Sequence, residues 1–557
     1  MNQPDNNPDS QLPDEIDPYT RDTSFFVDPP TSAVNILKNL GPGIILVGSI
    51  VGSGELIMTT KLGAQAGFVL LWFVLVSCLL KVVIQGELTR HTISSGRTFL
   101  DVFNSLPGPK CRRPVWLTLG WLGWITLSSY GSLACYTLLP EAKQTAQLAY
   151  GVVAGVILSW GMCAAIISAR RDDAVNRGQQ SMLPSERPNV NWFTWVWMGL
   201  LVLFFMNGGA ILGGAGQAME LAFPKLLGDH GATIWTVIVA AGSASILLSG
   251  KYGTLEKVSI GLVATFTVVT IICTVLLQWT GHAVTFDDIK QGLQFDLPGN
   301  LNAVIILTAL GMYAGTGVGW GEVCNYTYFC VEKGYARNVG EREQTDAWAN
   351  RARGWIRVMY IDVLITMVVY TVGTICFFFL GASILHSQGL DPSGPETLST
   401  LSNMYTESLG SWAATLFIVG AFFVLFSTVL AGVAGVSRLM TDTLHVLGIV
   451  SVHDYTARMR VIRFMVVFTL SMHAFTYSLF ENPPLMLMIA GLIAVFMYPV
   501  LGLGAIYLRH TDVDPRIAPS KPTTVWLWIC GGALAVISPG AIVLMIALQS
   551  GWITIGG

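Results

Sequence analysis

A five-residue pattern, Val-Gly-x-Gly-Glu, occurs twice in this sequence, at 51–55 and at 318–322, each time inside a long apolar segment. Glycine lowers the cost of leaving helical geometry by about 1 kcal/mol relative to alanine. A helix that breaks in hydrocarbon exposes backbone groups, which are tolerated only beside a cavity or a ligand. Free carbonyl and carboxylate oxygens can bind a cation, and free N–H groups attract an anion. We therefore predict a substrate- or metal-binding site formed by Gly52, Ser53, Gly54, Glu55, Thr316, Gly319, Trp320, Gly321 and Glu322.

The two glutamates of this pattern allow two interpretations. Glu55 and Glu322 could each cap the N-terminus of its own half-helix, where backbone N–H groups lack partners. Alternatively, both could face one central cavity and hold a cation together. Ionisable side chains inside a membrane are functional more often than not, which favours the second interpretation. Capping and ligand binding are compatible with each other.

The composition indicates a polytopic membrane protein. Hydrophobic residues make up 52% of the 557 residues and charged residues only 12%, whereas an ordinary globular chain carries about a quarter charged residues. The formal net charge of −3 gives no sign of a nucleic-acid partner. The nine cysteines show no C-x-x-C spacing, so neither a zinc site nor a disulfide framework is expected. No nucleophile–base pair or cofactor motif is present, and we expect neither enzymatic activity with catalytic residues nor a cofactor.

Hydropathy predicts thirteen membrane spans, because a span needs about 20 mostly apolar residues. The loops on the N-terminal side hold most of the Lys and Arg residues, whereas the opposite loops hold little more than Lys143, Lys225 and Lys290. This asymmetry predicts a cytoplasmic N-terminus. The predicted spans are 43–64, 67–89, 115–139, 147–168, 192–222, 232–249, 255–278, 301–331, 356–383, 410–436, 461–480, 484–508 and 524–548.

The positions of the two motifs suggest an internal repeat. If 115–139 and 147–168 form an inserted hairpin, the motifs fall in spans 1 and 6 of an eleven-span core. Two successive five-span units then run in opposite directions, as in secondary transporters that bind substrate between broken helices. We predict an all-α polytopic membrane protein with leucine-transporter-like inverted five-helix repeats, broken helices 1 and 6, about eleven core spans and an inserted two-helix hairpin. The expected parts are a disordered cytoplasmic tail (1–38), core spans 1–2 (39–112), the inserted hairpin and loop (113–190), core spans 3–5 (191–280), core spans 6–10 (298–510) and span 11 (523–557).

Several segments resemble one family of transporters. The stretch GPGIILVGSIVGSGELIMTTKLGAQAG (41–67) is similar to the first helix of the natural resistance-associated macrophage protein (Nramp) family, which begins G-P-G and breaks at D-P-G-N. The similarity continues in LLWFVLVSCLLKVVIQ, KYGTLEK, GTGVGWGE and FSTVLAGVAG (426–435). It covers most of the chain apart from the tail and the segment near 113–190. The resemblance implies divalent metal transport.

The departures from the family pattern fall on its chemistry. Gly52 and Glu55 stand where the family places the Asp and Asn of D-P-G-N, and residues 319–322 stand where it reads M-P-H-N. Its proton-path carboxylates fall near Asn207 and Ala210, and a glutamine of the tenth helix falls near Gly491. The family's metal and proton residues are therefore not carried over. This loss resembles the Nramp-related magnesium transporters.

The residues that remain suggest a hard-ion carrier. Loss of the methionine removes a soft ligand, and two carboxylates with backbone carbonyls and water suit Mg²⁺, Ca²⁺ or Mn²⁺. We expect transport of a hard divalent cation, with Mg²⁺ or Mn²⁺ favoured over Fe²⁺. The alternative is a transporter of an amino acid or other small organic solute that binds the unwound Gly-Ser-Gly segment. We further expect a monomer in the plasma membrane (the inner membrane if bacterial), and a structural Lys81 that snorkels or pairs with Glu87.

Overall fold

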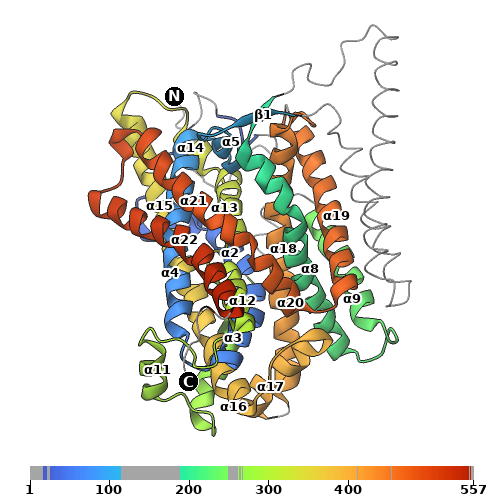
Figure 1. Ribbon diagram of the computed structural model, residues 1–557. Coiled ribbons are helices and arrows are strands. Elements are labelled where there is room, and N and C mark those ends of the chain that lie inside the picture. The colour runs from blue at the N-terminus through green and yellow to red at the C-terminus, as the bar shows by residue number, and fades with distance from the viewer. Residues whose placement is uncertain are drawn as a thin grey trace, which may run out of the picture.

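The computed structural model describes residues 17–21, 26–113, 188–248, 267–410, 412–452 and 454–550, together with residues 261, 265 and 552. The hairpin predicted at 115–168 lies outside these residues, and so do most of the predicted tail and part of the span predicted at 255–278. The described chain is a bundle of helices that run roughly between two ends of the molecule (Figure 1). The short helices α5 and α14 lie at one end, and α11, α16 and α17 lie at the other (Figure 1).

A helix lies over every predicted span that the described residues cover. Seven of these helices are long and apolar enough to cross a membrane, or eight when the segments Trp192–Met198 and Leu203–Ala222, which meet at 43°, count as one span. The first half of the chain contains α1 (Ala33–Asn39), α2 (Pro42–Ile50), η1 (Val51–Thr59), α3 (Thr60–Ala66), α4 (Leu71–Ser95), α5 (Phe99–Asn104), β1 (Lys110–Arg112), β2 (Asn189–Asn191), α8 (Trp192–Ala222), α9 (Gly231–Leu247), a helix at Thr267–Trp279 that ends in η3 (Leu277–Trp279), and α11 (Phe286–Gly292).

The second half continues the bundle and adds one amphipathic helix that hydropathy did not predict, α17. Its elements are α12 (Ala303–Gly315), α13 (Trp320–Glu332), α14 (Tyr335–Val339), α15 (Asp346–Leu380), η4 (Gly381–Leu385), α16 (His386–Gln388), η5 (Gly394–Glu396), α17 (Thr397–Leu409), α18 (Ala413–Val446), α19 (Tyr455–Phe480), α20 (Pro483–Gly491), α21 (Ile493–Thr511), η6 (Pro515–Ile517) and α22 (Lys521–Gln549).

Short polar side chains start several of the long helices. Each accepts a hydrogen bond from a backbone N–H of the first helical turn, which has no partner within its own helix. Pro483 and Pro484 follow one of these caps, at positions where a helix needs no N–H donor. The capping residues are Asn191 of α8, Asn302 of α12, Thr345 of α15, Asp454 of α19 and Asn482 of α20.

The first membrane span loses its α-helical geometry where the sequence predicts an interruption. The α-helix α2 ends at Ile50, and α-helical winding resumes only at Thr60. The interruption is not an open loop, because Val51–Thr59 is wound as a π-helix. A π-helix contains an extra residue per turn and occurs often at functional sites. The glycines of the first motif thus give a widened helix rather than a gap.

The π-helical segment η1 lies at the centre of the bundle. It packs against α12, α15 and α18, and α8 packs in turn against α18, α19 and α20. Buried apolar side chains surround these contacts and form two large clusters. The first motif therefore lies on an element that packs directly against α12, the helix that precedes the second motif.

A two-stranded ladder pairs the described residues on either side of the segment 114–187. Strand β1 pairs antiparallel with β2, with Lys110 opposite Asn191 and Arg112 opposite Asn189. The ladder lies at the same end of the molecule as α5 and α14 (Figure 1). The described chain consequently stops at residue 113 and resumes at residue 188 in neighbouring positions.

Candidate functional site

The second motif breaks the sixth core helix completely. Helix α12 ends at Gly315, α13 begins at Trp320, and Thr316 is extended with φ −90° and ψ 139°. Gly317 has φ +64°, a left-handed conformation that favours glycine. The break frees the last carbonyls of α12 and the first N–H groups of α13. These groups need partners, because the break lies inside the bundle.

The two interrupted helices approach each other at glycine. A methyl group added to Gly54 would overlap the backbone of Gly315, so only glycine allows this approach. Beside it, the hydroxyl groups of Thr59 and Thr316 are 2.8 Å apart and share a hydrogen bond. The motif glycine Gly54 and the predicted site residue Thr316 therefore form part of one contact between helices 1 and 6.

Glu55 binds the break of the other helix, not its own. Its Oε1 accepts hydrogen bonds from the Gly317 N–H (3.2 Å) and from the Thr374 hydroxyl (3.0 Å). The side chain is 0% exposed, and its Oε2 has no hydrogen-bond partner within the described residues. Capping thus explains one oxygen of Glu55, but the capped N–H belongs to the sixth helix.

Lys81 supplies the opposite charge at the same break. The Nζ atom donates to the carbonyl oxygens of Tyr313 (2.7 Å) and Thr316. The expectation that Lys81 snorkels or pairs with Glu87 is wrong, since Lys81 is fully buried and Glu87 instead pairs with Arg90. The free carbonyls at the end of α12 explain this placement, because a buried ammonium must be hydrogen-bonded.

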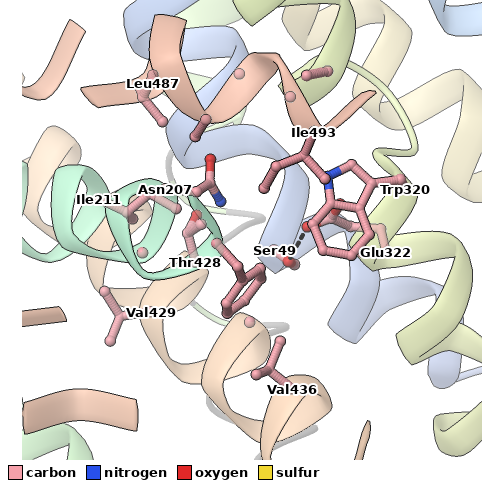
Figure 2. Close-up of a pocket in the computed structure, with 18 of the residues that line it drawn as sticks. Ser49, Asn207, Ile211, Trp320, Glu322, Thr428, Val429, Val436, Leu487 and Ile493 are labelled. Atoms are coloured by element: carbon pink, nitrogen blue, oxygen red, sulfur yellow. Dashed lines mark hydrogen bonds between the residues drawn. The ribbon is translucent and has the colours of Figure 1, made fainter. Parts of the chain in front are cut away.

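Glu322 lines a central cavity of about 50 Å³. Its Oε1 accepts a hydrogen bond from the Ser49 hydroxyl (2.8 Å), and part of its surface stays open to the cavity. Figure 2 shows Glu322 with Ser49 on one side of this space, next to Trp320, and Asn207 with Thr428 on the other. The cavity lies between the two interrupted helices and the helices α8, α18, α19, α20 and α21.

The predicted site residues divide into two groups. Gly54, Trp320, Gly321 and Glu322 line the cavity, whereas Glu55, Thr316 and Gly319 do not. The backbone of Gly52 and Ser53 lies in the π-helix η1, and their side-chain environment lies outside the described structure. The structure thus brings one of the two motif carboxylates to the cavity surface and places the other against the broken backbone.

Five further polar residues line the cavity that the sequence did not single out as ligands, namely Ser49, Asn207, Asn325, Thr428 and His473. Asn325 Oδ1 and both ring nitrogens of His473 are buried without a hydrogen-bond partner in the part of the chain that the structure describes. Asn325 follows Glu322 by three residues on α13, so helical spacing could have revealed it. His473 is an ionisable residue inside a span, which is also a recognisable signal.

No group of three or more His, Cys, Asp and Glu side chains able to hold a metal occurs among the described residues. A cation in the cavity would therefore contact one carboxylate, Glu322, together with hydroxyl, amide and backbone oxygens. Met58 also lines the cavity, but its terminal methyl group packs against Gly311. The arrangement suits a single, partly hydrated cation.

Comparison with known proteins identifies the family. The family model for natural resistance-associated macrophage protein-like sequences (Nramp) matches residues 174–545, which is more than half of the chain. This chain belongs to the Nramp family. It is thus a metal-ion transporter of the membrane. The match does not extend to residues 41–112, so the resemblance seen in the first helix stays a prediction.

Solved structures share the Nramp fold with this chain. A mutant form of the Eremococcus coleocola manganese transporter is 14% identical, covers 95% of this chain and 92% of its own, and has a TM-score of 0.56. The same transporter in complex with an aromatic bis-isothiourea substituted compound is 15% identical, covers 94% and 90%, and has a TM-score of 0.55. At this identity the likeness concerns the fold alone, and it confirms the predicted leucine-transporter-like architecture. A search of curated protein sequences found no match.

Of the three positions where the Nramp pattern led us to expect other polar residues, one lines the cavity and two do not. Asn207 lines it, and Ala210 is buried one turn further along α8. Gly491 ends α20, where an added methyl group would contact the backbone of Gly311. His473 packs against Gly208 of α8. A histidine on α19 thus lies close to the place where the Nramp pattern expects carboxylates on α8.

Proposed function

We propose that this Nramp-family protein transports a hard divalent cation, with Mg²⁺ or Mn²⁺ favoured over Fe²⁺, and that Glu322 is its principal ligand. The observation that carries the proposal is the partly open carboxylate of Glu322 in a cavity between two interrupted helices. Its neighbours Ser49, Asn207 and Thr428 supply oxygen atoms, which hard cations prefer. Glu55 has one oxygen without a partner, and its direct contact with the cation stays a prediction.

The size of the cavity supports an ion over the alternative of an amino acid or other organic solute. A cavity must have a volume of roughly 10–15 Å³ to hold one water molecule. A cavity of about 50 Å³ therefore holds a cation with a few water molecules, but little more. The alternative relied on an unwound Gly-Ser-Gly segment, and this segment is wound in the π-helix η1. Its N–H groups are thus less available to a substrate carboxylate than in an open loop.

The charge of Glu322 gives the decisive experiment. At an effective dielectric constant near 20, two unit charges 4 Å apart interact by roughly 4 kcal/mol before desolvation. If a quarter of this survives as net affinity, loss of the charge weakens binding roughly five-fold. We expect Glu322→Gln to weaken Mg²⁺ or Mn²⁺ binding at least five-fold in calorimetry on purified protein. Glu396→Gln is the matched control, because Glu396 is exposed in η5 outside the cavity.

The identity of the cation requires two further comparisons. A panel of Mg²⁺, Mn²⁺, Ca²⁺, anaerobic Fe²⁺ and amino acids should give saturable binding for the hard ions only. Met58→Leu, a change of similar volume, should leave their affinity unchanged, whereas a site that uses the thioether would lose affinity. Saturable binding of an amino acid with no response to any divalent cation would refute the proposal.

A further inference from the structure

The free carbonyls at the end of α12 form a cation-binding arrangement inside the bundle. The last carbonyls of a helix lack intrahelical partners and carry the negative end of the helix dipole. In a membrane protein such carbonyls, where a helix is interrupted, can coordinate a monovalent ion. Here the carbonyl oxygens of Tyr313, Ala314 and Thr316 all belong to the last turn of α12 and to the break that follows it.

The Lys81 side chain fills this arrangement. Its ammonium donates to the carbonyls of Tyr313 and Thr316, and it lies 5.1 Å from the centre of the Tyr313 ring and 5.4 Å from that of Tyr498. Backbone carbonyl oxygens and aromatic ring faces attract a cation although they carry no net charge. They can therefore hold the ammonium without a carboxylate hydrogen-bonded to it. The remaining carbonyl, that of Ala314, accepts a hydrogen bond from the Tyr498 hydroxyl (3.1 Å).

The buried carboxylate of Glu55 lies at the same break as the positive charge of Lys81. Glu55 accepts the N–H of Gly317, the residue directly after the Thr316 carbonyl that Lys81 binds. The ammonium and the carboxylate are both fully buried. A buried cation needs such compensation, since removal of one partner leaves an uncompensated charge in an apolar environment. The positively charged residue, Lys81, lies on α4, a helix that contains neither motif.

We propose that the break between α12 and α13 is a monovalent-cation site whose permanent occupant is the Lys81 ammonium. Because the ammonium is covalently attached to the chain through the Lys81 side chain, it occupies the site without the entropy loss of binding a free ion. The break therefore needs no exchangeable Na⁺ or K⁺ to hold its conformation. When Lys81 is replaced by a small residue, the empty site should bind a small monovalent cation, such as methylammonium or Na⁺. This inference does not depend on which divalent cation the protein transports.

Removal of the ammonium tests the proposal. Lys81→Ala in lipid nanodiscs should unfold several degrees below the wild-type protein when the buffer contains only N-methylglucamine chloride. Methylammonium, ethylammonium, Na⁺ or K⁺ at the same ionic strength should recover at least half of this loss with a saturable dependence. The wild-type midpoint should not distinguish these cations from N-methylglucamine. The measurement uses no divalent metal, so its failure is distinct from failure of the proposed function.

Lys81→Met is the matched control, because it keeps the length of the side chain without its charge. It should be destabilised and should not respond to small cations, since the side chain fills the space. If Lys81→Ala fails to fold, the readout is the yield of monodisperse protein extracted with methylammonium present, compared with N-methylglucamine. Wild-type stability of Lys81→Met would overturn the proposal, and so would a Lys81→Ala protein that no small cation stabilises.

Discussion

Glu55 and Lys81 bind the two ends of a single peptide group, the one that joins Thr316 to Gly317. The Lys81 ammonium donates a hydrogen bond to the carbonyl oxygen of Thr316, and the Glu55 carboxylate accepts a hydrogen bond from the N–H of Gly317. The two side chains come from α4 and η1, so three elements meet at one peptide. This peptide lies at the start of the break that separates α12 from α13.

The shared peptide predicts that Glu55 and Lys81 are energetically coupled. Glu55→Gln keeps an acceptor for Gly317 but leaves the ammonium uncompensated, and Lys81→Met leaves the carboxylate uncompensated. The double variant removes both charges and should be less destabilised than the sum of the single variants, by about 0.5–3 kcal/mol. Thermal unfolding of the four proteins in one lipid environment measures this difference. Additive shifts in the unfolding midpoint would contradict the coupling.

The contact between the interrupted helices predicts different outcomes for the two motif glycines Gly54 and Gly321. Gly54→Ala should destabilise the protein by about 1–3 kcal/mol or more, since the new methyl group would overlap the backbone of Gly315. Gly321→Ala is the matched control, because its methyl group would have no atom within 4 Å other than those of its chain neighbours and of the nearby backbone of its own helix. Unfolding midpoints should fall only for the first variant. Equal stability of both would show that helices 1 and 6 are not held at this distance.

A third glycine, Gly319, allows the position of Glu322 to be tested without removal of its charge. A methyl group at Gly319 would overlap the Oε2 atom of Glu322 and would press on the carbonyl of Ala314. We expect Gly319→Ala to weaken divalent cation binding several-fold through displacement of the carboxylate. Gly373→Ala on α15 serves for comparison, as its methyl group would meet open space. Calorimetry with Mn²⁺ should separate the two, and unchanged affinity in Gly319→Ala would argue against Glu322 as a ligand.

A polar cluster closes the end of the bundle where α14 lies. Arg438 of α18 makes two hydrogen bonds to Glu332 at the end of α13 (2.7 and 2.6 Å), and the Tyr19 hydroxyl donates to the same carboxylate (2.8 Å). Arg438→Met leaves the buried carboxylate without its cation, which costs about 3–5 kcal/mol. Hydrogen exchange in the last turn of α13 should therefore rise strongly.

The tyrosine of this cluster provides the graded control. Tyr19→Phe removes one donor of three and should raise hydrogen exchange much less than Arg438→Met. The double variant Arg438→Met, Glu332→Gln should exchange more slowly than Arg438→Met alone, because no unpaired charge remains. Exchange that is unaffected by Arg438→Met would show that the cluster does not hold α13 in place.

The helices and their interruptions follow from local patterns, and hydropathy and the position of glycine were sufficient to place them. The break at Gly317–Gly319 and the end of α2 at Ile50 illustrate this. The wound form of η1 was not predictable, because glycine permits an open loop and a π-helix alike. Helix α17 was missed because its apolar residues form only one face.

The partners of the buried charges could not be read from the sequence. Glu55 is 262 positions from Gly317, and Lys81 is 232 positions from Tyr313. A local pattern shows that a buried charged side chain needs a partner. The sequence offered several possible partners, including Glu87 for Lys81. The choice depended on which helices pack together, which only the three-dimensional arrangement of α4, η1 and α12 determines. For the same reason Glu322 and Glu55 looked equivalent in sequence but differ in their exposure to the cavity.

The ladder between β1 and β2 brings residues 110–112 and 189–191 side by side, although 76 residues separate Arg112 from Asn189 in the sequence. Because Lys110 lies opposite Asn191, a tight turn could join the two strands without moving α5 or α8. Replacement of residues 114–187 by such a turn would therefore keep the route of the chain through the described bundle. For the experimenter, this position is a natural attachment point for a fluorescent protein or a rigid fiducial in cryo-electron microscopy.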